Sequence, residues 1–246
     1  MNIEALTAAH QFRDAVGLQE TIWGFDKIEL LPARLFVTAT KVGGQAFGAY
    51  ANGKMIAFCL AIPGIKPGGP AYLHSHMLGV LPEYRNSGIG RRLKLRQRED
   101  ALSRNIRLIE WTFDPLELKN AYFNMQRLGA LVRRFVRNQY GATSSHLHGG
   151  LPTDRCTAEW WIGSGRVRRA IAGEPAVNPP IEERISVVND IGDIRRKDPE
   201  RARAIQSDLA GRIEAAFEKT LAIVGVERGT EETAYLFGHP EPAEFA

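Results

Sequence analysis

The sequence of 246 residues predicts an α/β fold, and two stretches of the chain carry that prediction. In the first stretch an apolar segment ends at Val80, and a short turn leads into a helix over residues 85–103. In the second, the β-prone residues 106–113 precede a helix that starts after Asp114-Pro115. Strands that alternate with helices in this way are typical of α/β proteins. The length and the 44% hydrophobic content allow a full buried core.

The elements before this centre follow from periodicity and turn residues. Pro32 suits the first turn of a helix, and Asn52-Gly53 is a strong hairpin signal. The expected elements are helices over 7–22 and 31–42, strands over 45–50 and 54–62, and a loop over 63–70 that precedes the strand ending at Val80.

The chain after residue 129 is expected to add strands, a linker and a further helix. The expected elements are strands over 130–139 and 156–162, a Pro-rich linker over 173–180, a strand over 184–188, a helix after Asp198-Pro199 and a hairpin of 221–226 with 233–237. The helix has an apolar stripe that must be covered. We therefore expect a first domain over residues 1–172 and a C-terminal α+β extension over residues 173–246, packed on that domain or on a second subunit.

The turn over residues 85–90 predicts an anion site. The N–H groups and the positive dipole end of the following helix favour phosphate oxygens. Glycine has no Cβ, so it leaves those amides open to a ligand. The turn lacks the Lys-Ser/Thr pair of a Walker A loop and the third glycine of a Rossmann fingerprint.

The pattern Arg85-x-x-Gly88-x-Gly90 resembles motif A of the GNAT N-acetyltransferase superfamily, which holds the pyrophosphate of acetyl-CoA. The helix after Asp114-Pro115 resembles motif B, and the whole resemblance covers roughly residues 1–165. It implies a GNAT-type acyl-CoA N-acyltransferase fold, with a mixed, splayed sheet flanked by helices. One departure is Met125, which stands where the family usually has a tyrosine, the common general acid.

The resemblance also implies acetyl-CoA, or another acyl-CoA, as co-substrate. Backbone groups at the end of the strand would pair with the pantetheine arm, and the amides of the turn would hold the diphosphate. The cofactor-binding residues assigned in this way are Leu78, Gly79, Val80, Arg85, Asn86, Ser87, Gly88, Ile89, Gly90, Arg91, Asn120 and Phe123. Arginines gather around the turn and suit an anionic ligand, although a solvated helix face is the alternative for Arg96 and Arg98.

His74 and His76 lie two residues apart on a predicted strand, so their side chains share one face. An attacking amine must lose a proton, and histidine accepts protons near neutral pH. The pair falls where serotonin N-acetyltransferases, members of the same family, carry paired histidines proposed to take that proton through water. The alternatives are a packed strand histidine and, more weakly, a metal site, for which the sequence offers no obvious further ligand.

The remaining candidates concern the leaving thiolate and the acceptor. Tyr122 lies near the position of Met125 on the same helix and is the candidate general acid, with water as the alternative. In the family a hairpin after motif B borders the acceptor site. It offers four candidate substrate contacts: His146, His148, Asp154 and Arg155.

Composition limits the functional classes. A net charge of +4 without interleaved basic and aromatic residues argues against nucleic-acid binding. The sequence contains no run of 18 apolar residues, so we expect no membrane span. Its two isolated cysteines favour a reducing cytoplasmic location. We expect direct acyl transfer from acyl-CoA to an amine of a small molecule or amino acid, without a metal. A succinyl group, a homodimer, a non-catalytic acyl-CoA-binding regulatory module and a basic protein-binding factor remain alternatives.

Overall fold

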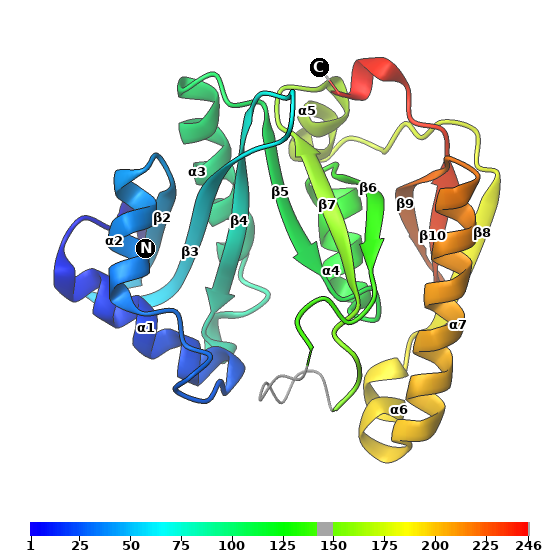
Figure 1. Ribbon diagram of the computed structural model, residues 1–246, viewed down its shortest axis with the longest axis horizontal. Helices are drawn as coiled ribbons and strands as arrows, with labels where there is room; N and C mark the ends of the chain where they lie inside the picture. Colours follow the sequence, from blue (N-terminus) through cyan, green and yellow to red (C-terminus); the bar gives the residue numbers. More distant parts are fainter. Residues whose placement is uncertain (142–149, 246) are drawn as a thin grey trace. The chain divides into compact units, whose positions relative to one another are not determined.

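A computed structural model describes residues 1–141 and 150–245 of the chain. These residues form two compact units, one over residues 1–110 and one over the described residues from Trp111 onward. The boundary falls within strand β5 (Leu108–Phe113), shown in green in Figure 1.

The first unit is a sheet with helices on both faces. Its elements are β1 (Asn2–Ala5), α1 (Ala9–Trp23), α2 (Ala33–Lys41), β2 (Gln45–Ala51), β3 (Lys54–Ile65), β4 (Ala71–Val80), the 3₁₀ turn η1 (Pro82–Tyr84) and α3 (Ile89–Ser103). Strands β1 to β4 pair antiparallel in chain order, and β4 pairs parallel with the first residues of β5. The sheet is therefore mixed.

Side chains that alternate along β3 contribute to two hydrophobic cores, one on each face of the sheet in this unit. Phe58 and Leu60 pack with residues of α1 and α2, whereas Ala57 and Cys59 face α3 and pack near Leu93. Successive side chains of a strand point to opposite faces, so one buried strand reads as a continuous apolar run. This arrangement fixes β4 and the start of α3 against a rigid centre.

The second unit contains the predicted motif B helix and everything after it. Its elements are α4 (Leu118–Tyr122), the π-helical turn η2 (Phe123–Arg127), β6 (Leu131–Val136), β7 (Arg155–Trp161), α5 (Gly165–Ala172), β8 (Glu183–Val188), α6 (Ile191–Lys197), α7 (Pro199–Glu218), β9 (Ala222–Arg228), β10 (Glu232–Gly238) and the 3₁₀ turn η3 (Pro242–Phe245). The ladders β7–β6, β6–β9, β9–β10 and β10–β8 are antiparallel. The mixed α/β architecture with a sheet flanked by helices is thus confirmed (Figure 1).

The C-terminal extension packs on the start of α4. Arg195 of α6 donates to the carboxylates of Asp114 and Glu117, each at 3.1 Å, and the hydroxyl of Tyr235 on β10 donates to the carbonyl of Pro115. These contacts place the extension in the same compact unit as motif B. The boundary between the units therefore does not coincide with the domain boundary expected near residue 172.

Several element boundaries differ from the sequence prediction for local reasons. The helix expected over 85–103 begins at Ile89, because Asn86 (φ 61°) and Gly88 (φ 83°) adopt left-handed backbone conformations. The helix expected after Asp114-Pro115 begins at Leu118, since the Asp114 carboxylate caps a turn by accepting from the N–H of Leu116. The strand β1 and the helices α5 and α6 were not predicted. Within residues 1–141 and 150–245, the helices are too short or too polar to span a membrane.

Candidate functional site

A bulge in β4 sets the geometry of the two histidines. Ser75 opposes Ala61 of β3, and Met77 opposes Leu60, so His76 is an extra residue in the ladder. Before the bulge, Ser75 faces α3. After it, Leu78 and Val80 face α3 instead. A bulge re-aims side chains in this way, and bulges occur often beside functional sites.

His74 and His76 lie side by side on the face of β4 away from α3. Their ring centroids are 5.9 Å apart, with the planes tilted by 44°. His74 is half-buried and His76 is exposed. Desolvation by the surrounding protein nevertheless lowers the pKa of His76, which favours the neutral imidazole that can accept a proton.

A buried carboxylate that the sequence analysis missed lies next to His74. Glu110 is the ladder partner of His74 in the parallel β4–β5 pair, and its side chain is only 2% exposed. Lys66, at the end of the β3–β4 hairpin, forms an ion pair with this carboxylate. A charged residue in the middle of the apolar strand 106–113 is the sequence signal that could have found it.

The turn before α3 is open where the predicted phosphate contacts lie. A Cβ added at Gly88 would meet no atom within 4 Å, and at Gly90 the nearest atom would be Leu78 Cδ2 at 3.6 Å. The first N–H groups of a helix have no partner within the helix, so these amides suit an anion. The residues present therefore fit the diphosphate of an acyl-CoA.

Arg85 stabilises this turn through the protein rather than pointing at a ligand. Its Nε donates to the carbonyl of Val80 at 3.3 Å, and its guanidinium also donates to the carbonyl of Ile22 at 3.4 Å. Ser87 donates its hydroxyl to the carbonyl of Tyr84. The side chain of Arg85 thus holds the turn against β4 and α1, and that of Ser87 ties the turn to η1.

A buried polar network supports β4 from the α3 side. Lys94 donates to the hydroxyl of Ser75 at 2.9 Å, and that hydroxyl donates to Gln97 at 3.0 Å. Burial lowers the pKa of Lys94 to about 7 and raises the pKa of the Cys59 thiol to about 12. The Cys59 thiol therefore stays protonated in the core, in keeping with packing rather than nucleophilic chemistry.

The candidates on motif B belong to the second unit, whereas the histidines and the glycine turn belong to the first. Tyr122 stacks under Arg228 of β9, whose guanidinium carbon lies 3.8 Å from the ring centroid. Arg127 lies 5.8 Å from the same ring. Asn120 lies in the middle of α4, and Phe123 is the first residue of η2, which continues the same helical segment.

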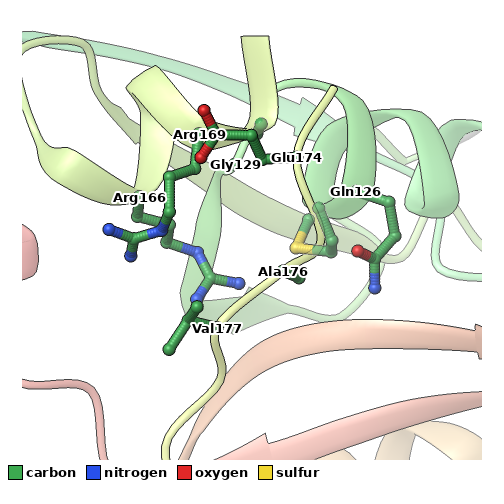
Figure 2. A pocket seen from close by; sticks show the side chains of 9 residues that line it. Gln126, Gly129, Arg166, Arg169, Glu174, Ala176 and Val177 are labelled. Atoms are coloured by element: carbon green, nitrogen blue, oxygen red, sulfur yellow. The ribbon is translucent and has the colours of Figure 1, made fainter. Parts of the chain in front are cut away.

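Met125 is buried in the second unit, with a side chain about 1% exposed. It borders a small pocket that opens to solvent between η2, α5 and the segment after α5 (Figure 2). The pocket is lined by Met125, Gln126, Gly129, Arg166, Arg169, Ala170, Glu174, Ala176 and Val177. None of the predicted site residues lines it, so we do not assign it to the acyl-CoA site.

The predicted substrate contacts near β7 are engaged inside the second unit. Asp154 is buried and accepts from the backbone N–H of Asn138, and desolvation raises the pKa of its carboxyl group. Arg155 is buried, donates to the carbonyl of Asp154 and lies 5.3 Å from the ring of Tyr140. His146 and His148 lie outside the described residues. Over residues 1–141 and 150–245, no three His, Cys, Asp or Glu side chains gather as a metal site would require.

Residues 14–129 match the model of the acetyltransferase (GNAT) family, and this segment contains both histidines, the glycine turn and motif B. The chain carries a GNAT domain. The match ends at Gly129, so β6 and all later elements of the second unit lie beyond it. No curated protein sequence matches the chain.

Solved structures of GNAT proteins share the fold at low identity. The ribosomal-protein-S18-alanine N-acetyltransferase from Escherichia coli is 18% identical, with a TM-score of 0.51, and the match covers 65% of this chain and 93% of that one. Naa20 of Chaetomium thermophilum, solved with a bisubstrate analogue, is 16% identical, with a TM-score of 0.53 and coverage of 72% and 92%. An aminoglycoside 6′-acetyltransferase type Ii is 19% identical, with a TM-score of 0.52 and coverage of 66% and 97%.

Proposed function

We propose that the protein transfers an acyl group, acetyl by default, from acyl-CoA to an amine of a small molecule or amino acid. The observation that carries this proposal is the histidine pair at a bulge of β4, on the strand that leads into the open glycine turn of α3. The neighbours named above include an N-acetyltransferase of an alanine of ribosomal protein S18 and an acetyltransferase of aminoglycosides, which supports an amine acceptor without choosing its kind.

In this mechanism the first unit binds the donor and prepares the acceptor. The amides of Gly88, Ile89 and Gly90 hold the diphosphate, and the backbone of residues 78–80 pairs with the pantetheine arm. A backbone N–H near Leu78 polarises the thioester carbonyl. Because the turn presents amides and no carboxylate, it favours the strongly anionic end of CoA.

The histidine pair removes a proton from the acceptor amine. The carboxylate of Glu110 attracts the ammonium form of the acceptor, and His74 and His76 then accept its proton. The neutral amine attacks the thioester carbon, and its nitrogen loses a second proton to water as the amide forms. The C–S bond breaks, and the thiolate takes a proton from water or from Tyr122. No covalent enzyme intermediate is needed.

The alternative is a regulatory module that binds acyl-CoA without turnover. Met125 favours it, because a thioether at the usual tyrosine position cannot donate a proton. Reduced buried thiols at Cys59 and Cys156 support a cytoplasmic location for either function.

Release of CoA thiol with a panel of primary amines tests the proposal. The panel would contain small amines, amino acids, an aminoglycoside and short peptides with free N-termini. Amine-dependent thiol release supports the enzyme. CoA binding without release by any amine would favour the regulatory module, and absence of CoA binding would reject both.

A further inference from the structure

A primary amine of the protein itself contacts the carboxylate of the candidate site. Lys66 follows β3 in the hairpin that leads to β4, and its Nζ forms an ion pair with Glu110. The Lys66 side chain is 38% exposed, whereas Glu110 is 2% exposed. Nζ also lies 5.2 Å from the ring centroid of Tyr72, the second residue of β4. The amine is thus held at the sheet by a side chain that stays partly exposed.

The same carboxylate connects Lys66 to the histidines. Glu110 and His74 are ladder partners, and side chains of paired residues project to the same face of a sheet. His76 lies on that face as well, with its ring 5.9 Å from that of His74. One amine, one carboxylate and two imidazoles therefore gather in the first unit. This is the set of groups that an amine acceptor and its base would form.

We propose that Lys66 is itself an acyl acceptor, so that the protein acylates its own chain when no external amine is bound. This inference rests on the proposed acyltransferase function. The Lys66 nitrogen forms an amide bond with the acyl carbon, and the C–S bond of acyl-CoA breaks. The Lys66 ammonium first loses one proton to imidazole, which passes it to water. The nitrogen loses its second proton to water as the amide forms, and the thiolate leaves and takes a proton from water.

Two consequences follow from the chemistry. The nitrogen of acylated Lys66 is an amide and not a nucleophile, so each chain is modified once at this position, and the neutral side chain no longer pairs with Glu110. An external amine that binds Glu110 displaces the Lys66 ammonium, so a good acceptor slows the modification. Self-acylation and turnover therefore compete for one carboxylate.

Lys54 provides a matched control on the same strand. It is the first residue of β3 and is exposed, so it reports the ordinary chemical reaction of a lysine with a thioester. The full-length protein is incubated with acetyl-CoA and no amine, and acetylation is followed by peptide mass spectrometry. We expect Lys66 to be acetylated at least about tenfold faster than Lys54. An amine accepted in turnover should slow acetylation of Lys66 only.

Three variants connect the signal to the site. Lys66→Arg should abolish acetylation of the peptide that contains residue 66. The double variant His74→Ala/His76→Ala should slow Lys66 acetylation about 10²-fold without changing Lys54, as loss of a general base predicts. Glu110→Gln should also slow Lys66 selectively, and it serves as an independent variant if the double variant does not fold.

Each contrary result has a separate meaning. Equal rates at Lys66 and Lys54, or a Lys66 rate that the variants leave unchanged, would identify chemical acetylation and overturn the inference. An unmodified Lys66 in a protein that releases CoA thiol with an amine would overturn the inference and leave the proposed function intact. An unmodified Lys66 together with no thiol release for any amine would overturn both.

Discussion

The candidate site residues of the first unit and those of the second unit differ in how the protein uses them. In the first unit, the turn at Gly88 is open and the histidine rings lie at an accessible edge. In the second, Tyr122 is stacked under Arg228, and Asp154 and Arg155 are buried among protein partners. The glycine turn and the histidines of the first unit thus remain accessible, whereas the candidates of the second unit are engaged by neighbouring protein groups.

The largest expected effect follows from the glycine turn. Gly88→Asp adds a carboxylate and a side chain where amides meet diphosphate, and losing a few such hydrogen bonds at about 1.5–3 kcal/mol each weakens CoA binding by orders of magnitude. Isothermal titration calorimetry measures the affinity of the variant for CoA. Gly53→Asp is the matched control, because Gly53 also has a positive φ and open space. Wild-type CoA affinity in the Gly88 variant would discard the phosphate assignment.

The next effect tests the base. The double variant His74→Ala/His76→Ala should keep CoA affinity and lose about 10²–10⁴-fold in turnover. His239→Ala, in the second unit, should leave the rate unchanged. An unaltered rate in the double variant would remove the histidines from the mechanism, and lost CoA affinity would make them structural.

The same pair predicts a pH dependence. The pKa of His76 is lowered, so its imidazole stays neutral to lower pH than an ordinary histidine and accepts protons across the neutral range. The rate should fall only as pH drops below the ordinary histidine value of about 6.5. A profile of kcat/KM against pH measures this limb. Loss of rate already above that value would contradict the assignment of His76.

A stability effect should appear in the second unit. Arg195 is buried between Asp114 and Glu117, and breaking a buried pair on one side costs about 3–5 kcal/mol. Arg195→Met should therefore lower the free energy of unfolding by that amount in a denaturant titration. The exposed neighbour Arg196, paired with Asp193, is the control, and Arg196→Met should cost at most about 1 kcal/mol. Similar costs for both variants would refute the anchoring role of α6.

The smallest effect concerns the thiolate. CoA thiolate leaves fairly well without help, so Tyr122→Phe should cost less than about tenfold in turnover. A loss as large as that of the histidine variant would make Tyr122 the general acid and would place chemistry in the second unit. Met125→Tyr is the complementary test, because it restores a phenol at the position where the family usually has its tyrosine. A marked increase in rate would show that protonation of the thiolate limits the native protein.

The fold was predictable where one local signal determines an element. Asn52-Gly53 marks the β2–β3 hairpin, and Asp198-Pro199 marks the start of α7. The start of α3 was misplaced by four residues, because the left-handed backbone at Asn86 leaves no trace in apolar periodicity. The helices α5 and α6 were missed because they are short and rich in arginine, and tertiary contacts such as that of Arg195 stabilise them.

For the candidate site, the sequence could group only residues that lie on the same strand. The spacing of His74 and His76 predicts a shared face, but Glu110 joins them through a parallel ladder with a strand about 35 residues later. The charge of Glu110 within an apolar strand was a visible signal, but pairing between distant strands has no local signature. The sequence therefore could not place Glu110, or its partner Lys66, beside the histidines.

The bulge at His76 also bears on how this site changes by insertion and deletion. Removing His76 would make Ser75 and Met77 neighbours, opposite the neighbours Ala61 and Leu60. The ladder would become regular, and every side chain on either side would keep its present face. One of the two imidazoles is therefore carried by a residue whose loss leaves the register of the sheet intact. A single-codon deletion would interconvert a two-histidine and a one-histidine form of the same strand.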